Sequence, residues 1–426
     1  MNERAGERPL KCAYLTHYPY WPGEALLACP RLELVALHPS VLRLPSDHNP
    51  FDLPEDDRAD VALVTAWWRR WLVAQHPDRA EQVMRELERR ASVLVGVDGP
   101  DRFALTFPPR DLKRFEIVLK LQGIYHDRDL YNYAVGPQFA GALPPPGVPA
   151  LEFGDWTGTL RPIRSRYDGA DLEKLRLSVP CYVTEFPAIR RRFRAWETRS
   201  ASWAGRRISP AERFGRDLGD TVLAHAIGFA GGHCRPLEVH CLTGLTHVQR
   251  IEAVRVLNGF SGTRGIVAID GRGPARLSGT SNGEDGLPGD VAGELSASAS
   301  KFSRMRVGRF RFLLDLRRHR VGVAPTGYGE LGNRHGAVLL SGAALVCQNL
   351  SHVEMMLPLK DGDNVVFCRP DLSDLRERVN WLLSDDAVRT RIARAGRQSY
   401  MDWAGGWRDH LHKGIEAHIF EAVQGK

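Results

Sequence analysis

The segment VGVAPTGYGELGNRHGAVLLSGAALVCQ, residues 321–348, decides the fold class of this chain. An apolar run leads into a turn that carries Gly327, Gly329 and Gly332. Helical spacing follows to about residue 341, and a second apolar run, ALVCQ, comes next. This order of strand, glycine turn, helix and strand is typical of a parallel sheet with helices on its faces. The segment therefore predicts an α/β unit.

The same turn predicts a binding site for a phosphate-sized anion. Glycines let the backbone approach a ligand without obstruction by Cβ, and a helix that starts near Asn333 or Arg334 points its positive end at that ligand. Arg334 can add paired hydrogen bonds to a pyrophosphate. The spacing matches neither a P-loop nor a dinucleotide fingerprint. Two interpretations stay open, because Arg334 either binds an anion or closes a surface salt bridge.

Outward from this segment, the chain divides into two units. EVHCLTGL at 238–245 predicts a strand, and HVQRIEAVRVLN at 247–258 predicts a helix with one apolar stripe. In the first half, short apolar runs at 12–16, 61–65, 92–97 and 117–119 alternate with helical patterns. We expect domains at residues 1–232 and 233–400, with a terminal helix in 401–426 that packs back on the first domain.

Composition excludes several classes of protein. Of the 426 residues, 43% are hydrophobic and 26% are charged, which is typical of globular proteins. The start is polar and no run of about 18 uncharged apolar residues occurs, so we expect a cytoplasmic protein without a membrane span. The seven cysteines are scattered and include no C-x-x-C pair, which argues against a disulfide framework and a zinc site.

The net charge of +7 is compatible with a nucleic acid, an anionic substrate or an acidic membrane face as partner. Arginine clusters at 190–194 and 304–311 carry much of it, and such clusters are most often solvated. Basic and aromatic residues do not interleave as in a known nucleic-acid reader, so we expect no nucleic-acid partner. Peripheral association with a membrane stays open, as does the oligomeric state.

Residues 301–400 resemble the donor-binding half of GT-B glycosyltransferases. The likeness is greatest to the capsule-associated and protein O-glucosyltransferase family and looser to exostosin-type enzymes. The matching elements, in chain order, are FRFLLDLRRH (310–319), PTGYG (325–329), Arg334, GAVLLSGAALVCQ (336–348), Glu354, DLSDL (371–375) and RIARAGRQ (391–398). The resemblance implies two Rossmann-like domains facing a cleft. It also implies a nucleotide-sugar donor, with a UDP-sugar favoured, and no cofactor.

The resemblance assigns the donor diphosphate to Arg334, with Arg250 as a second phosphate ligand. Arg250 can equally be a solvated position on an amphipathic helix. Glu354 either reaches a donor hydroxyl or ribose, or is structural. The full set of expected donor-binding residues is Arg334, Arg250, Gly327, Tyr328, Gly329, Glu330, Asn333, His335 and Glu354.

Many retaining GT-B enzymes carry two glutamates eight positions apart around this loop, where this chain has Gly329 and Ala337. The departure favours an inverting mechanism, which needs one general base. Asp98 follows a buried apolar run, where ligands of open α/β sheets bind, and is the first candidate. Its alternative is a plain turn residue, because Asp-Gly-Pro is a common turn composition. Asp101 and His17 are the other candidates, and His17 can equally pack in its aromatic loop.

A D-x-D pattern in HDRD, 126–129, arises readily by chance, so we expect no metal site and a metal-independent reaction. Trp67, Trp68 and Trp71 fit either an acceptor groove or a buried helix. The acceptor can be a glycan, a protein or a small molecule. A protein that binds a glycan or an anionic partner without catalysis is the alternative function.

Overall fold

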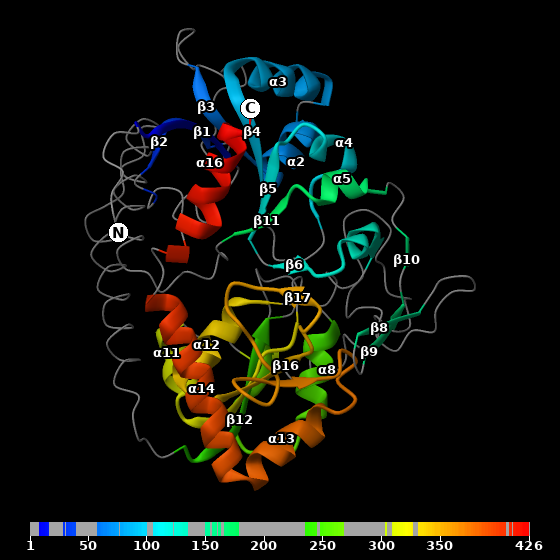
Figure 1. Ribbon diagram of the computed structural model, residues 1–426. Helices are drawn as coiled ribbons and strands as arrows, with labels where there is room; N and C mark the ends of the chain where they lie inside the picture. The colour runs from blue at the N-terminus through cyan, green and yellow to red at the C-terminus, as the bar shows by residue number, and fades with distance from the viewer. Residues whose placement is uncertain are drawn as a thin grey trace.

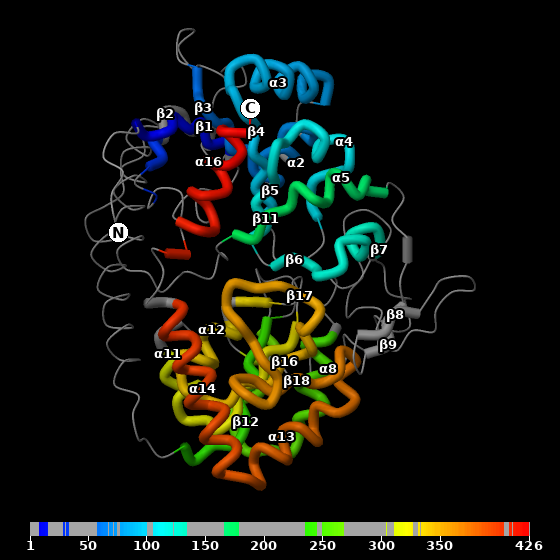
Figure 2. The backbone as a smooth tube through the Cα atoms, in the orientation of Figure 1, coloured from blue at the N-terminus to red at the C-terminus, as the bar shows by residue number. Residues whose placement is uncertain are grey.

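In the computed structural model of the chain, the described residues are 8–16, 29, 31–39, 58–75, 77–99, 105–121, 123–134, 150–153, 156–159, 161–162, 166–178, 235–244, 248–267, 303–304, 309–326, 331–405, 409–410 and 412–425. They form two units, each built on a six-stranded sheet, and Figure 1 shows one unit above the other. The smooth trace in Figure 2 follows the chain through the first unit, into the second and back to the first at the C-terminus.

The first sheet is entirely parallel, in the order β11-β5-β4-β3-β1-β2. Its strands are β1 (Leu10–Thr16), β2 (Leu32–Pro39), β3 (Ala59–Thr65), β4 (Ala91–Asp98), β5 (Ile117–Lys120) and β11 (Leu175–Leu177). The helices of this unit are α2 (Ala66–Gln75), α3 (Pro77–Arg90), α4 (Pro109–Leu112) and α5 (Gly169–Leu172). In α3 the buried residues are Ala80, Val83, Met84 and Leu87, a helical spacing that places one apolar stripe against the sheet.

The second sheet is also parallel, in the order β14-β13-β12-β15-β16-β18. Its strands are β12 (Leu237–Gly244), β13 (Arg264–Val267), β14 (Ser303–Arg304), β15 (His319–Val323), β16 (Ala344–Gln348) and β18 (Val366–Cys368). Numbered along the chain within this unit, the order is 3-2-1-4-5-6, the Rossmann order. Its helices are α8 (Val248–Val256), α11 (Arg309–Leu316), α12 (Asn333–Ser341), α13 (Leu375–Ser384) and α14 (Asp386–Gly405).

Alternation along the strands gives the second sheet two apolar faces. Val321 and Val323 of β15 belong to the core shared with α8 and α13. Gly322 lies between them, and a Cβ there would stand 2.6 Å from the Val338 side chain of α12. Only glycine therefore allows this close approach of α12 to the sheet. On that face the core continues into the first unit, so one apolar cluster spans both.

Two contacts join the units. The short strand β6 (Ile124–Tyr125) pairs antiparallel with β17 (Val353–Glu354). Beside this pair, the His126 amide donates to the His352 carbonyl oxygen at 3.1 Å. At the C-terminus, the π-helical turn η3 (His412–Glu416) leads into α16 (Ala417–Gln424), which packs against β3, β4 and β5 of the first sheet (Figure 1).

The remaining described elements lie outside the two sheets. They are η1 (Arg128–Asn132), β7 (Tyr133–Ala134), β8 (Ala150–Phe153), β9 (Trp156–Thr159) and β10 (Arg161–Pro162). The predicted α/β fold with two parallel, Rossmann-like sheets is confirmed. Of the three tryptophans on α2, Trp68 is fully buried, so the buried-helix interpretation holds for that residue.

Candidate functional site

The candidate donor site lies at the carboxyl edge of the second sheet. The strand order reverses between β12 and β15, and ligands of open α/β sheets bind outside such a reversal. Arg250 reaches this point from α8. Its Nε donates to the Thr326 carbonyl oxygen at 3.2 Å and its Nη1 to the Gly244 carbonyl oxygen at 3.3 Å. One guanidinium is thus held across the ends of the two central strands.

Arg334 lies beside this edge, in the first turn of α12. Its side chain is partly buried, and burial lowers the pKa of the guanidinium. Nε and Nη1 are buried and have no hydrogen-bond partner among the described residues. The centroid of the Phe312 ring lies 6.0 Å from the guanidinium carbon. A partly buried cation with two buried donor atoms that are unused is the arrangement expected of a site for an anion.

His335 shapes the start of α12. Its Nδ1 lies 3.0 Å from the Gly332 amide nitrogen and 3.2 Å from the Gly332 carbonyl oxygen, and its buried Nε2 has no partner among the described residues. Burial, with smaller contributions from the guanidiniums of Arg334 and Arg250, lowers the pKa of His335 to about 4. The ring is therefore neutral at pH 7, and its Nε2 is a further buried polar atom that has no partner among the described residues.

A buried amide network that the sequence analysis missed supports this edge. The Thr326 amide donates to Gln348 Oε1 at 3.0 Å, and Gln348 Nε2 donates to Gln249 Oε1 at 2.9 Å. The network joins the ends of β15 and β16 to α8. In the sequence, Gln348 ends an otherwise apolar run. An amide side chain at the end of a buried strand is the sequence feature that could have predicted this network.

Behind Arg334, a histidine pair packs against α11. The His240 and Phe312 rings are 5.1 Å apart edge to face, and His240 Nε2 lies 3.5 Å from Asp315 Oδ2. Burial lowers the pKa of His240, and it lowers that of His319 to about 4. Burial acts to raise the pKa of Asp315, yet its contacts with His240 and Thr263 outweigh burial and lower it to about 2. Asp315 therefore stays ionised beside neutral rings.

Asp98, the first candidate base, lies at the end of β4 and is fully buried. Its Oδ2 accepts from the Thr106 amide at 2.8 Å, and its Oδ1 lies 3.6 Å from Nζ of Lys120, which is equally buried. In this conformation the carboxylate does not reach the surface of the molecule. It binds the backbone at Thr106, eight residues further along the chain, and neutralises the buried ammonium group of Lys120.

The other predicted site residues divide into two groups. Glu354 is exposed on β17, where it pairs with Ile124 of the first unit. Asn333 is the first residue of α12, and its side chain is not described. The predicted residues outside the described ranges are His17, Asp101, Gly327, Tyr328, Gly329 and Glu330.

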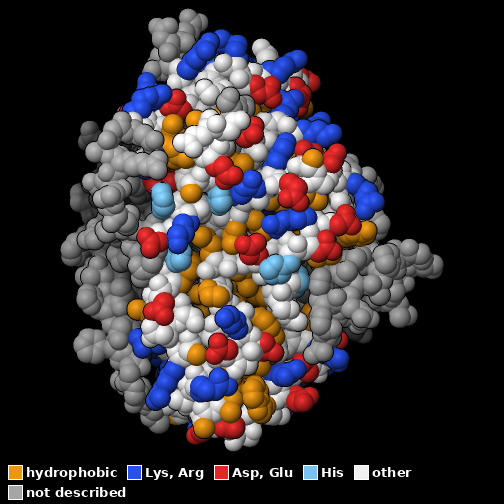
Figure 3. Space-filling model, viewed as in Figure 1, with side chains coloured by type: hydrophobic (Ala, Val, Ile, Leu, Met, Phe, Trp, Pro, Cys, Tyr) orange, Lys and Arg blue, Asp and Glu red, His pale blue; other side chains and the backbone are white. Residues whose placement is uncertain are grey.

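The D-x-D carboxylates are engaged in local structure. Asp127 Oδ1 accepts from the Asp129 amide at 3.0 Å, and Asp129 Oδ1 accepts from Asn132 Nδ2 at 2.9 Å. Within the described ranges, no three His, Cys, Asp or Glu side chains gather closely enough to hold a metal ion. In the same part of the chain, no helix is both long and apolar enough to cross a membrane. Figure 3 shows histidine and hydrophobic side chains across the middle of the molecule, where the two units meet.

Comparison with known proteins finds similarity at the level of structure only. No protein-family model matches the chain, and no curated protein matches it significantly in sequence. A glycosyltransferase from Rickettsia africae superposes with a TM-score of 0.42 at 9% identity, covering 86% of this chain and 77% of that one. Anabaena HepE in complex with UDP-glucose gives 0.40 at 11% identity, covering 84% and 79%.

A third solved structure, a trehalose 6-phosphate synthase from Burkholderia multivorans, gives a TM-score of 0.41 at 13% identity and covers 86% of this chain and 72% of that one. All three TM-scores lie below 0.5. The fold assignment therefore rests on the strand orders of the two sheets.

Proposed function

We propose that the chain is a glycosyltransferase that moves a sugar from a nucleotide diphosphate donor to a hydroxyl acceptor. The observation that carries this proposal is the buried guanidinium of Arg334, whose Nε and Nη1 have no partner in the described part of the chain. It stands at a helix start, beside Arg250 and at the reversal of strand order, where fixed positive charge suits a diphosphate.

In the proposed reaction, the diphosphate leaves as the acceptor oxygen attacks the anomeric carbon. Negative charge grows on the leaving diphosphate, and Arg334, Arg250 and the first amides of α12 stabilise it. Guanidinium groups and a helix end supply this charge without help from a metal, so we propose a metal-independent reaction. The absence of the paired glutamates at Gly329 and Ala337 supports inversion at the anomeric carbon.

Inversion at the anomeric carbon needs a general base. Asp98 is buried against Lys120, so we assign it to the structure of the β4 edge rather than to proton transfer. In the sequence, His17 directly follows β1 and Asp101 follows β4 by three positions. We propose these two as the candidate bases, and we propose a UDP-sugar as the donor on the family resemblance.

Calorimetric titration with UDP, GDP and UDP-glucose tests the donor site. We expect one nucleotide to bind, and Arg334→Ala to weaken that binding by about 2 kcal/mol, as for loss of a charge-assisted hydrogen bond. Arg255→Ala is the matched control, because Arg255 lies on α8, is 61% exposed in its side chain and pairs with Glu252. Absence of nucleotide binding by the folded protein, or equal effects of the two substitutions, would sink the assignment.

The burial of Asp98 keeps one alternative open, a protein that binds nucleotide sugar or glycan without transferring it. Slow hydrolysis of the bound donor separates the two functions, since a catalytic site transfers to water at a measurable rate. If a donor binds through Arg334 and no hydrolysis or transfer occurs, the non-catalytic function holds. If hydrolysis occurs, the anomeric configuration of the released sugar, read by NMR, tests inversion.

A further inference from the structure

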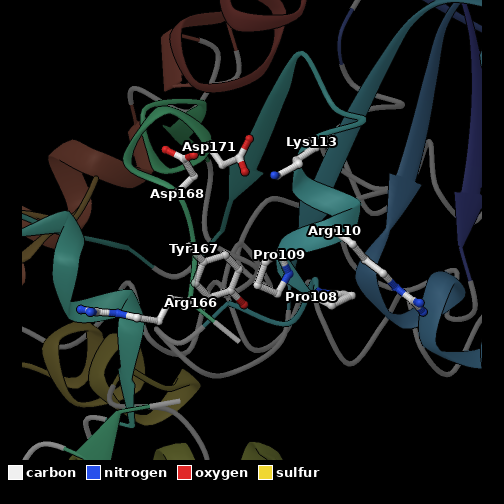
Figure 4. Close-up of a pocket in the computed structure, with 8 residues that line it drawn as sticks. All are labelled: Pro108, Pro109, Arg110, Lys113, Arg166, Tyr167, Asp168 and Asp171. Atoms are coloured by element: carbon white, nitrogen blue, oxygen red, sulfur yellow. The ribbon is translucent and has the colours of Figure 1, made fainter. Parts of the chain in front are cut away.

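A second pocket, of about 780 Å³, opens on the first unit between α4 and α5 (Figure 4). This volume lies within the range of small-molecule sites. In Figure 1 these two helices lie beside the first sheet, well away from α12 of the second unit. The pocket is therefore separate from the candidate donor site, and no part of the proposed reaction uses it.

Buried charges fix both walls of the pocket. Arg69, 1% exposed, donates to Asp111 of α4 through Nε at 2.8 Å and Nη2 at 3.0 Å. Lys174, just after α5, donates from Nζ to the Leu112 carbonyl oxygen at 3.3 Å and pairs with Asp171 Oδ1 at 3.3 Å. The first contact anchors α4 and the second ties α5 to it, so the pocket is preformed.

Asp171 supplies an unused acceptor at the pocket. The residue is 5% exposed and lines the pocket from α5. Its Oδ1 is paired with Lys174, whereas its Oδ2 has no hydrogen-bond partner among the described residues. Buried carboxylate oxygens normally have partners, so this atom marks a place where a ligand donor completes the structure. A hydroxyl group is such a donor.

The rest of the lining is apolar on one side and basic around it. Tyr167 is 9% exposed, and its hydroxyl donates to the Phe107 carbonyl oxygen at 2.7 Å, which fixes the ring beside Pro108 and Pro109. Figure 4 shows Lys113 pointing across the pocket toward Asp171, while Arg110 and Arg166 extend outward at its two ends. These three cations outnumber the two lining carboxylates, Asp168 and Asp171.

We propose that this pocket binds an acidic saccharide, a sugar ring that carries a carboxylate or a phosphate. A ring hydroxyl donates to Asp171, the apolar face of the ring packs against Pro109 and Tyr167, and the anionic group pairs with Lys113. A neutral sugar uses only the first two contacts, and a bare anion uses only the third. The combination of a buried acceptor, an apolar wall and a facing ammonium group selects a ligand with all three features.

Ligand-observed NMR titration of the full chain tests the site with four probes: trigalacturonate, glucose 6-phosphate, maltotriose and inorganic phosphate. We expect one of the two acidic sugars to bind at least about fivefold more tightly than maltotriose and inorganic phosphate. Comparison of the carboxylated with the phosphorylated sugar identifies the anion. Tighter or equal binding of inorganic phosphate, equal binding of maltotriose, or no saturation at about 10 mM of any probe overturns the proposal.

Variants locate the binding. Asp171→Asn should weaken it by about tenfold or more, as for loss of a charge-assisted hydrogen bond. Lys113→Gln, at an exposed position that does not endanger folding, should remove the preference for acidic over neutral sugar. Arg89→Gln is the control, because Arg89 is a 65% exposed cation of the same unit on α3. Equal binding by wild type, Asp171→Asn and Lys113→Gln refutes the site. Arg334→Ala should leave saccharide binding unchanged, so failure of the donor site and failure of this pocket are distinguishable.

Discussion

Arg250 donates from Nε to the carbonyl oxygen of Thr326, 3.2 Å away at the end of β15. Its Nη1 donates to the Gly244 carbonyl oxygen at the end of β12. Gly244 is the last residue of β12 and Thr326 follows β15 by three residues, and the order of the sheet reverses between these two strands. The cation is therefore held by the backbone itself at the point where this fold receives ligands.

Arg250→Ala should reduce both stability and donor binding. Two carbonyl oxygens lose a charged donor, which we expect to lower the free energy of unfolding by about 1.5–3 kcal/mol. Urea unfolding measures this loss, and calorimetry with the nucleotide that wild type binds measures the second effect. Arg255→Ala should change neither quantity. A variant that loses stability but binds the nucleotide as wild type does would restrict Arg250 to a structural role.

Gln348→Leu should destabilise the second unit through the loss of hydrogen bonds, because the two side chains are similar in size. The substitution removes the acceptor of the buried Thr326 amide and the donor to Gln249 Oε1, so we expect a loss of about 2 kcal/mol in urea unfolding. Gln398→Leu is the matched control, because Gln398 is exposed on α14, where its Nε2 donates to Asp402 Oδ1 at 2.7 Å. Equal effects of the two substitutions would show that the network contributes nothing.

Local pattern was enough to predict much of the second unit. A helix start near Asn333 and an end near residue 341 follow from glycine placement and apolar spacing, and α12 spans Asn333–Ser341. Apolar runs of the first half likewise became β1, β3, β4 and β5. These features depend on residues close in sequence, so a single sequence contains them.

Long-range partners could not be predicted in this way. Lys120 ends an apolar run, and only the parallel register of β4 with β5 sets it opposite Asp98. The same holds for Gln348, whose partners lie 22 and 99 positions away in the chain. From its position at a strand end, Asp98 is predicted to face a ligand. The register of β4 with β5 instead places it beside Lys120, its counterion. The sequence pattern therefore predicts where the strands end, but it does not predict which side chains at those ends are buried and paired.

Stability should fall as the pH is lowered from about 6.5 toward 4. Burial lowers the pKa of His335 to about 4, below the ordinary value of about 6.5 that it has when unfolded. Between these values the unfolded state binds the extra proton, so stability is complete above pH 6.5 and is lost as the pH falls. At pH 5, this one residue lowers the free energy of unfolding by about 2 kcal/mol relative to its value at high pH.

Chemical unfolding of wild type and His335→Gln at pH 7 and pH 5 measures this effect. The variant should lose less stability than wild type on going from pH 7 to pH 5, since its side chain does not titrate. Other buried histidines contribute the same slope to both proteins, so the difference between the two proteins isolates His335. Parallel curves would mean that His335 is protonated as easily in the folded as in the unfolded protein.

Asp111→Asn should be strongly destabilising, in contrast to substitution of an exposed ion pair. Arg69 and Asp111 are each 1% exposed, so removal of the carboxylate charge leaves a buried guanidinium that, in the described part of the chain, is compensated only by Glu81. We expect a loss of about 3–5 kcal/mol in urea unfolding. Glu86→Gln, which breaks the surface pairs with Arg89 and Arg90, should cost less than about 1 kcal/mol.

Asp98 and Lys120 allow a test that separates structure from catalysis. Asp98→Asn should lower the free energy of unfolding by about 3–5 kcal/mol, because it removes the buried carboxylate that pairs with the buried Lys120 ammonium group. Lys120→Met should be destabilising for the converse reason. The double variant should recover most of the loss, since an uncharged pair carries no uncompensated charge.

Donor hydrolysis, measured per folded molecule, then decides the role of Asp98. If the carboxylate serves only to neutralise Lys120, the double variant regains hydrolysis together with stability, and this is the result we expect. If Asp98 is the general base, the double variant regains stability and remains inactive. Nucleotide binding, measured in parallel, should be unchanged in the double variant, because Arg334 and Arg250 lie on the other unit.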